Sequence, residues 1–567
     1  MSAGPRSTFP IVCATLLALA GAASAQQPKP YDLVITNGHI VDGTGSPWYS
    51  GDVGIRDGRV ADIGVLTGAA RTRTIDARGM VVAPGFIDML GQSEETILVD
   101  PRLPSKIYQG ITTEITGEGE SAAPLNDAIV TARKMKYAQL KINPDWRTLG
   151  QYFARLEKQG MGINFASYVG ATQVREMVLG YEDRQPTSVQ LEAMRVLVHA
   201  AMRDGAVGVS TSLQYPPAPY ARTEELIALA TEAANSGGIY ATHMRSEGDA
   251  IVQALDESVR IGREAHIPVE IWHLKVAGKS NWGRMPEVLG RINAARAQGV
   301  DITADTYAYT AWFNEMTAFI PPWASAGGNA KLVERLKDPA TRERIRRELL
   351  TPSSEWDNEW QEVPGPEAIM ICRVQNPQLL QFKGKRLTDV AKAWNKDPMD
   401  ALFDFLIADE AFTHNAVFGM SEPDVSLAVQ QPWVSFDNDS RGTAPEGLLG
   451  EEHPHPRAYG TFPRVLRKYV REEKLLTLPD AIRKMSALPA QRMRLTDRGV
   501  LKQGMWADIV IFDPDTIRDL ATFENPNQLS QGMEYVLVNG VPVIEQGKMT
   551  GKLPGKVLRG PAYRPGS

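Results

Sequence analysis

Cysteine is almost absent from this sequence. Its 567 residues include two cysteines, Cys13 and Cys372. Cys13 lies in an N-terminal segment that we expect to be removed, so the mature chain keeps Cys372 alone and cannot form an internal disulfide. A single cysteine of this kind is more typical of a packed core thiol than of a nucleophile. The sequence therefore excludes a fold held together by disulfides.

A basic excess is also missing. The chain has 61 Lys and Arg against 67 Asp and Glu, and a net charge of −6. Such a balance cannot neutralise a phosphate backbone, so nucleic acid is excluded as a partner. The hydrophobic share of 43% and the charged share of 23% are ordinary for globular proteins and exclude a disordered chain. The length predicts one large domain with a smaller one.

Long apolar runs are limited to the N-terminus. Residues 9–22 are apolar, follow Arg6 and precede Ala23-Ser24-Ala25, which is the pattern of a secretory signal peptide cleaved after Ala25. The alternative, an uncleaved membrane anchor, needs about 20 apolar residues, more than this run supplies. We therefore predict a signal peptide at 1–25 and an exported mature protein, periplasmic or secreted, without a stable membrane anchor.

Both ends of the chain have the pattern of short strands joined by tight turns. Residues 31–83 alternate apolar and polar positions around Asn37-Gly38 and Asp57-Gly58, and such pairs are typical of hairpin turns. The C-terminal region repeats the pattern around Asn539-Gly540. We predict one small β-sandwich domain made from residues 26–83 and 500–560.

The long middle region, residues 84–499, has a different pattern. Apolar β-branched runs such as "IYATHM", "VEIWHLKV" and "VDITADTY" alternate with amphipathic segments rich in Ala, Glu and Arg. Strands alternating with helices predict a parallel sheet, and so many units favour an α/β fold of the distorted TIM (β/α)8 barrel type as the catalytic domain. Residues 340–366 are rich in charge, Trp and Pro, and we predict an insertion or lid there.

Three polar residues end apolar runs of the predicted barrel. His243 and His273, two of only eight histidines, end two successive runs, and Asp439 ends a later one. Barrel enzymes carry their reactive groups at the C-terminal ends of strands, where two neighbouring imidazoles can hold a tetrahedral metal ion. A nearby carboxylate can bind the metal or take a proton from water. The alternatives are structural histidines and an aspartate that caps a turn.

A series of sequence blocks resembles one enzyme family. The chain is similar to the D-aminoacylase (N-acyl-D-amino-acid deacylase) family of the amidohydrolase superfamily from about residue 31 to about residue 560, through the blocks "VVAPGFID", "GITTEITGEG", "YATHMRSEG", "VEIWHLKVAG", "DITADTY", "HPRAYGTFPRVL" and "GMWADIVIFDP". The resemblance implies a distorted TIM barrel with a β-sandwich and zinc-dependent hydrolysis of an amide. It also implies that His243 and His273 are zinc ligands and that Asp439 is catalytic.

The sequence departs from this family at several ligand positions. Leu90 and Gln92 stand where the family carries a His-x-His motif after the first barrel strand, and Ala171 replaces a further histidine. The bridging cysteine of the family is absent, and Glu118 or Glu120 takes its place. A carboxylate is an acceptable zinc ligand, and we favour Glu118; the alternative for both is a solvated loop. These changes predict one zinc ion per chain.

Substrate contacts are predicted near the two histidines. Lys275 follows His273 by two residues, so on a strand both side chains share a face and the cation can hold a substrate carboxylate; the resemblance implies the same role. Arg245 bears the same relation to His243, with a structural ion pair, to Glu247 or a neighbour, as its alternative. The resemblance also places Tyr215 in the pocket.

Other aromatic and histidine-rich segments have weaker signals. The segments 311–313 and 319–323 are candidate walls for an acyl chain, or core or oligomer contacts. His453 and His455 have His-x-His spacing, but they flank a proline in a predicted loop, which favours a loop role over a displaced metal motif.

These features predict a metal-dependent hydrolase acting on the C–N bond of an N-acyl amino acid, with the D form implied by the resemblance. A catalytically silent metal- or ligand-binding barrel is an alternative from another class. Hydrolysis of a lactone, a cyclic imide or a dipeptide is a closer one. We expect a small-molecule substrate, and the sequence leaves a homo-oligomer open.

Overall fold

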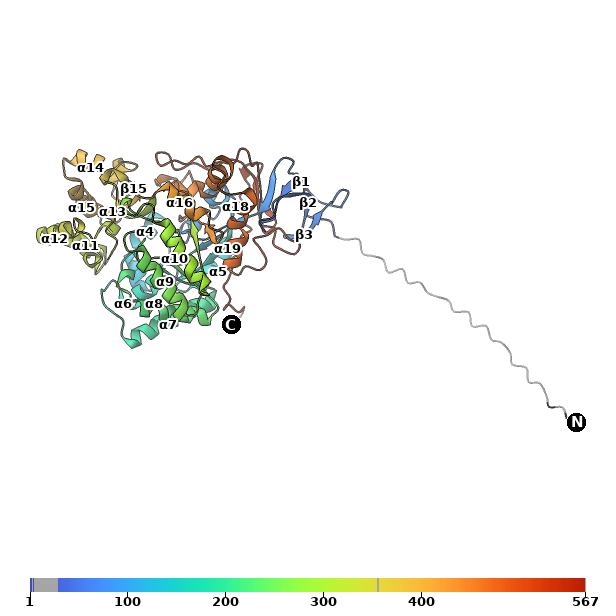
Figure 1. Ribbon diagram of the computed structural model, residues 1–567, viewed down its shortest axis with the longest axis horizontal. Helices are drawn as coiled ribbons and strands as arrows, with labels where there is room; N and C mark the ends of the chain where they lie inside the picture. Colours follow the sequence, from blue (N-terminus) through green and yellow to red (C-terminus); the bar gives the residue numbers. More distant parts are fainter. Residues whose placement is uncertain (3, 5–28, 354–355, 566–567) are drawn as a thin grey trace.

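The computed structural model describes residues 29–353 and 356–565, together with Met1, Ser2 and Gly4 (Figure 1). The predicted signal peptide and its cleavage site otherwise lie outside the described residues. Among the described helices, none combines the length and the apolar character needed to cross a membrane.

Strands from both chain ends form one nine-stranded sheet, at the right-hand end of Figure 1. Its strands are β1 (Leu33–Ile40), β2 (Tyr49–Arg56), β3 (Arg59–Gly64), β4 (Thr74–Asp76), β5 (Val81–Pro84), β18 (Ile509–Phe512), β19 (Met533–Val538), β20 (Val541–Glu545) and β21 (Lys548–Met549). The two ends join where β5 and β18 pair antiparallel, with Pro84 opposite Ile509. Apolar side chains from both ends share one buried cluster that includes Ile35, Val53 and Leu537, so each end of the chain stabilises the other.

The last part of the predicted segment 500–560 leaves this sheet. Residues after β21 run along the barrel instead, where Met161 bridges Pro554 and Phe165 bridges Val557. The Gly560 backbone N–H then donates to the Gly205 carbonyl oxygen. The C-terminal segment therefore fastens the β domain to the barrel wall.

Two parallel sheets form the wall of the barrel. They contain β6 (Phe86–Asp88), β7 (Ile111–Thr116) and β8 (Asn164–Ser167) in one, and β9 (Val169–Gly170), β10 (Gly208–Ser212), β11 (Ile239–His243), β12 (Val269–Ile271), β13 (Ile302–Thr306) and β17 (Val434–Phe436) in the other. β8 runs almost directly into β9, which connects the sheets on one side. On the other side a parallel bridge between Gly91 and Ser440 joins the ends of β6 and β17. These contacts join the two sheets on both sides, in agreement with the predicted distorted (β/α)8 barrel.

Helices cover the outside of this wall. The described helices outside the insertion are α1 (Thr96–Val99), α2 (Pro104–Ile107), α3 (Asp127–Ala132), α4 (Lys134–Gln139), α5 (Leu149–Gln159), α6 (Ala171–Leu179), α7 (Ser188–Asp204), α8 (Thr223–Asn235), α9 (Ile251–Glu264), α10 (Met285–Ala297), α16 (Glu422–Val429), α17 (Arg457–Arg464), α18 (Leu478–Met485) and α19 (Ala487–Arg492). The ends of α7 are set by local sequence. Thr187 and Gln190 form a capping box at its start, and Gly205 ends it at φ 115°. Its buried face includes Met194, Val198 and Met202.

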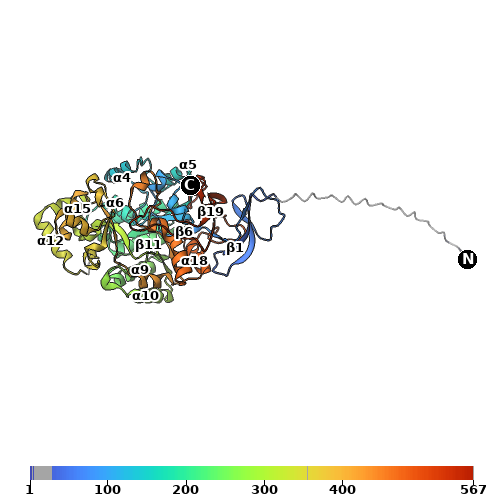
Figure 2. The same cartoon turned by 90° about the horizontal axis from the view of Figure 1, so that it is seen from above.

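A long insertion separates β13 from β17. It carries an antiparallel sheet of β14 (Trp312–Glu315), β16 (His414–Val417) and β15 (Ile369–Arg373), with α11 (Asn329–Lys337), α12 (Pro339–Leu349), α13 (Glu359–Glu362), α14 (Leu387–Trp394) and α15 (Pro398–Ala408). Figures 1 and 2 place α12 and α15 at one end of the molecule and β1 at the other, with the barrel between them. The segment predicted as a lid, residues 340–366, thus covers α12 and α13 within a larger unit.

Candidate metal centre and active site

The barrel brings the predicted reactive residues to one end. His243 is the last residue of β11, His273 follows the end of β12, Glu118 follows β7 and Asp439 follows β17. Because these strands are parallel, their C-terminal ends meet at the same rim of the barrel. His273 and Asp439 have φ angles of 39° and 41°, a left-handed conformation that is uncommon outside glycine and is frequent at functional sites. Tight backbone turns therefore aim both side chains.

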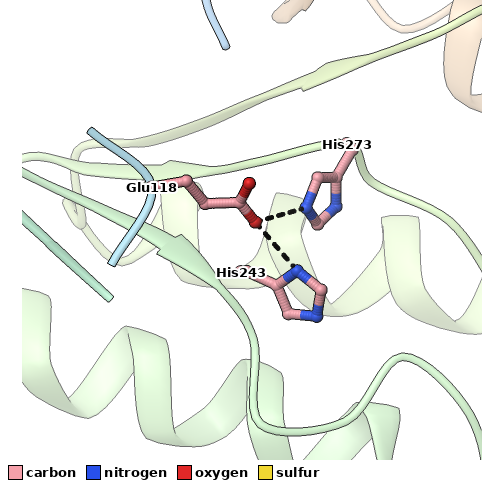
Figure 3. Close-up of side chains that lie close together, drawn as sticks. All are labelled: Glu118, His243 and His273. Carbon is pink, nitrogen blue, oxygen red and sulfur yellow. Dashed lines mark hydrogen bonds and ion pairs between the residues drawn. The ribbon is translucent and has the colours of Figure 1, made fainter. Parts of the chain in front are cut away.

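Glu118, His243 and His273 converge on one point (Figure 3). The Glu118 Oε1 atom lies 3.1 Å from His243 Nδ1 and 3.4 Å from His273 Nε2. Ligand atoms about 2.0–2.2 Å from a tetrahedral zinc ion lie about 3.3 Å from one another, so these separations fit zinc. All three ligand atoms lie within 4.8 Å of one another. The three residues can therefore hold a zinc-sized cation.

The structure also shows which of the two candidate glutamates, Glu118 or Glu120, faces the histidines. Glu120 points to Arg133, with an Oε2 to Nη2 distance of 3.1 Å, and its side chain is 45% exposed. Glu118 is the carboxylate that faces the histidines, as favoured from the sequence.

The electrostatics of the triad favour a positive charge at its centre. Burial would raise the pKa of Glu118, but hydrogen bonds from His243 and His273 hold it well below its ordinary value. Burial and Lys275 would lower the pKa of His273, but Glu247, Asp439 and Glu118 outweigh them and raise it to about 10. A bound cation satisfies the same carboxylates without protonating an imidazole.

Each histidine has outer partners on its second ring nitrogen. The His243 Nε2 atom lies 2.9 Å from the Gln214 Oε1 acceptor, and His273 Nδ1 lies 2.9 Å from Glu247 Oε1 and 2.7 Å from Lys275 Nζ. A proton on His243 Nε2, and one on His273 Nδ1 toward Glu247, leave the lone pairs of His243 Nδ1 and His273 Nε2 for a metal. From the sequence, Glu247 is expected only as an ion-pair partner of Arg245, although it follows His243 by four residues. The sequence does not predict the role of Gln214.

Gln92 joins the triad to Asp439. Its Nε2 donates to Glu118 Oε2 at 2.7 Å and to Asp439 Oδ1 at 2.9 Å. The Arg457 guanidinium lies 2.9 Å from Asp439 Oδ2. Burial raises the pKa of Asp439, and the charges of Arg457 and His273 oppose that rise. Asp439 is thus held next to the metal position by two groups that hydrogen-bond or pair with its ionised form.

A buried lysine lies below Gln92. The Lys106 Nζ atom is 2.8 Å from Asp88 Oδ2, 2.9 Å from Glu114 Oε1 and 2.8 Å from Asn438 Oδ1. Its side chain has no solvent exposure. Leu90 packs in an apolar cluster with Met89 and Ile115. No sequence pattern points to Lys106, which lies in the short helix α2 just before β7.

The predicted substrate residues separate into two groups. Lys275 and Tyr215 line an open cavity of about 270 Å³ above the triad, and the Tyr215 ring lies 5.1 Å from that of His243. Lys275 Nζ is 2.6 Å from Glu247 Oε1. The structure does not bring Arg245 to this cavity. Its Nε donates to Glu257 Oε2 at 2.9 Å, the structural ion pair weighed as its alternative, because β11 ends before Arg245 and same-face spacing no longer applies.

Two further sequence expectations have clear positions. Trp312 and Phe313 line the cavity, whereas Trp323 lies under the Arg344 guanidinium at 3.7 Å. His455 lines the cavity from a loop, where its Nδ1 accepts from the Arg457 backbone N–H and its Nε2 faces the Ala311 carbonyl. The loop position predicted for His455 is confirmed.

A closed barrel with a three-residue metal position and an adjacent aspartate at its rim defines a metal-dependent hydrolase site. Residues 73–345 and 449–544 match the model of the amidohydrolase family. The chain is 37% identical to a D-aminoacylase of Alcaligenes xylosoxydans xylosoxydans, over 94% of this chain and 99% of that protein.

Solved structures are similar in the same way. A zinc-bound N-acyl-D-glutamate deacylase of Bordetella bronchiseptica, in complex with a phosphonate inhibitor, is 34% identical with a TM-score of 0.78, over 94% of this chain and all of that one. A D-aminoacylase studied for its binuclear metal centre, with one-metal activation and second-metal attenuation, is 33% identical with a TM-score of 0.77 over the same shares. The chain therefore belongs to the D-aminoacylase family of amidohydrolases.

Proposed function

We propose that this protein is a deacylase that binds one zinc ion and hydrolyses the amide bond of an N-acyl-D-amino acid. The observation that carries the proposal is the convergence of Glu118, His243 and His273 within 4.8 Å, with Asp439 joined to the triad through Gln92. The names of the relatives given above, a D-aminoacylase and an N-acyl-D-glutamate deacylase, support this substrate class.

The residues of the chain divide the chemistry among them. Zinc bound by the triad supplies Lewis-acid activation of water and of the amide carbonyl. Asp439 accepts the proton of the attacking water on a carboxylate oxygen and returns it to the departing amide nitrogen. Gln92 and Arg457 keep that carboxylate in place, while Glu247 orients His273.

The proposal of one zinc ion rests on the residues beside Asp439. Leu90 offers no ligand atom, and the Gln92 amide places N–H donors between Glu118 and Asp439. The Lys106 ammonium already pairs with both Asp88 and Glu114. An N–H group and an ammonium repel a cation, so this side of the rim is unsuited to a second metal.

Substrate orientation is proposed from the cavity lining. Lys275 lines the cavity and supplies a cation for the substrate carboxylate, with its Nζ held by Glu247 Oε1 at 2.6 Å. Tyr215, Trp312 and Phe313 supply apolar surface for the acyl group or the side chain. Arg245 has no part in this proposal.

We also propose that the protein works outside the cytoplasm. The support is the sequence alone: the apolar run 9–22 after Arg6, followed by Ala23-Ser24-Ala25. N-terminal sequencing of the exported protein should begin at Gln26, and an uncleaved N-terminus would contradict the proposal.

The test combines metal content with turnover. We expect about one zinc per chain in protein purified without a metal-affinity tag, and hydrolysis of N-acetyl-D-amino acids over their L enantiomers. A variant with both His243→Ala and His273→Ala should lose both properties. Failure to bind added zinc would overturn the proposal. Zinc binding without turnover on a broad amide panel would favour the silent metal-binding barrel.

A further inference from the structure

The insertion reaches one of the metal histidines through a short chain of hydrogen bonds. Gln214, whose Oε1 faces His243 Nε2 at 2.9 Å, donates its Nε2 to Glu359 Oε1 at 3.0 Å. Glu359 is the first residue of α13 and is 1% exposed. A residue of the predicted lid segment is therefore one side chain removed from a metal ligand.

The hydrogen bonds of this chain run in one direction from its far end. Asn415 on β16 donates its Nδ2 to Asn314 Oδ1 at 2.8 Å, so the Asn314 amide turns its own Nδ2 toward Glu359. That Nδ2 lies 2.6 Å from Glu359 Oε1, the same oxygen that Gln214 contacts. The antiparallel sheet of the insertion thus orients the first links of the chain.

Glu359 Oε1 is the acceptor for both of these amides, at 2.6 Å from Asn314 and 3.0 Å from Gln214. Burial and the charge of Asp357 raise the pKa of Glu359 to about 8, and Oε2, which makes no hydrogen bond in the described structure, is the oxygen left to carry the proton. Gln214 must therefore turn its Nε2 toward Glu359 and its Oε1 toward His243. His243 then carries its proton on Nε2 and presents the Nδ1 lone pair to the metal position.

The fold of the insertion holds Glu359 in place. The neighbouring Asn358 donates its Nδ2 to the carbonyl oxygens of Leu349 and Thr351, at 3.1 and 3.2 Å, near the end of α12. Gln361 donates to the Leu349 carbonyl at 2.7 Å. These side chains use carbonyls that the ending helix leaves free, so Glu359 has little freedom to move.

We propose that Glu359 is a positioning residue that selects the metal-binding tautomer of His243 through Gln214. The insertion, in addition to covering the barrel rim, then tunes the metal affinity of the barrel. This inference rests on the proposed function, because it needs the triad to bind a metal.

Two variants of Glu359 separate an acceptor from mere bulk. Glu359→Leu removes the acceptor, so Gln214 is free to flip and His243 loses its preferred tautomer. Glu359→Gln keeps an oxygen that Asn314 can hold in the same place. Glu362→Leu is the matched control, because Glu362 lies on the same helix and is 3% exposed, while the Gln214 amide bonds to Glu359 and His243 instead.

The first measurement is zinc affinity, by competition with a chromophoric chelator on the full mature chain. Loss of an outer partner of a metal-bound histidine weakens affinity by about 10–100-fold. We expect that loss in Glu359→Leu, a change of less than about threefold in Glu359→Gln, and wild-type affinity in Glu362→Leu. The visible absorption of the cobalt-substituted protein should change in Glu359→Leu alone. Thermal unfolding of the metal-free variants checks that each one folds.

The outcomes distinguish the two proposals. A wild-type chain that binds no zinc overturns the proposed function. A wild-type chain that binds zinc, with Glu359→Leu binding equally well, overturns the positioning role alone. Equal weakening in Glu359→Leu and Glu362→Leu, or in both Glu359 variants, also overturns it, because the acceptor oxygen would then not be what matters.

Discussion

The two sides of the barrel rim solve the same electrostatic problem with different cations. On the side of β11 and β12, His243 and His273 face Glu118 with ligand atoms spaced for a metal ion. On the side of β6, the buried Lys106 ammonium lies between Asp88 and Glu114. We call these the metal side and the lysine side. Ionised buried carboxylates need a positive charge within contact distance. On the lysine side that charge belongs to a side chain of the protein.

The difference shows how a metal site can be remodelled without losing the barrel. A lysine side chain satisfies carboxylates permanently, because it cannot dissociate, but it has no ligand lone pair while it stays charged. The metal side needs an exogenous ion and gains chemistry from it. Gln92 forms the border, since its amide contacts Glu118 on one side and Asp439 on the other.

The largest expected effect is at the border of the metal side. Asp439→Asn removes the proton acceptor, and general base catalysis contributes about 10²–10⁴-fold. We therefore expect kcat to fall by about that factor while zinc content stays at the wild-type level. Glu120→Gln, a neutralised acid that lines the same cavity, is the control and should keep its activity. Wild-type turnover by Asp439→Asn would remove the assigned base.

The lysine side should be tested by stability. Lys106→Met leaves Asp88 and Glu114 buried without their cation, and breaking such an ion pair destabilises a protein by about 3–5 kcal/mol. Urea unfolding at saturating zinc measures this. Lys331→Met is the control, since its Nζ pairs with Glu334 at 2.7 Å between side chains that are 56% and 69% exposed, and such pairs contribute less than about 1 kcal/mol. If both variants lost the same free energy of unfolding, the buried lysine would not stabilise the protein more than an exposed one.

Glu94 is a buried carboxyl group whose pKa is set mainly by burial and not by a nearby cation, so it contrasts with the carboxylates of both sides. Burial and the charge of Glu95 raise its pKa from 4.5 to about 8. The folded state therefore binds its proton more tightly than the unfolded state, and this stabilisation is lost as pH rises from about 4.5 to about 8. Glu94→Gln should remove that loss and raise the free energy of unfolding by about 5 kcal/mol at pH 9, with little change at pH 4.5. If the free energies of unfolding of Glu94→Gln and the wild type differed by the same amount at both pH values, the raised pKa of Glu94 would be contradicted.

The smallest expected effect concerns the border residue itself. Gln92→Leu removes an N–H donor from Asp439, so the protonated carboxyl is favoured and its pKa rises. Loss of a hydrogen bond to a charged group, about 1.5–3 kcal/mol, predicts that the acidic limb of the kcat profile moves up by about one pH unit. Gln503→Leu, in the β domain, should leave the profile in place. An unmoved limb in Gln92→Leu would assign Gln92 to packing alone.

Most of the architecture was predictable because its signals are local. The turn pairs at Asp57-Gly58 and Asn539-Gly540 join β2 to β3 and β19 to β20, as predicted. The turn predicted at Asn37-Gly38 is wrong, because these residues lie inside β1, where the pairing with β2 shifts register as at a bulge. The apolar runs that end at His243 and near His273 mark barrel strands. The larger extent of the insertion was less predictable, since its three-stranded sheet pairs segments that are far apart in the chain.

Site residues were likewise predictable where a local pattern marks them and not where loop geometry places them. Spacing by two residues is reliable only while a strand continues, and it failed for Arg245 because β11 ends at His243. Glu118 and Glu120 differ by where the loop after β7 turns, and Gly117 makes that turn at φ 100°.

The sequence by itself determined the fold class, the family, and the identities of His243, His273 and Asp439, because each lies at the end of a periodic apolar run and within recognisable blocks. Only the tertiary structure decided the outer partners: Lys106 beside Asp88, Gln92 between Glu118 and Asp439, and Glu359 behind Gln214. The physical reason is that a hydrogen bond or an ion pair depends on distance and orientation in space, and barrel closure brings together groups that lie hundreds of residues apart.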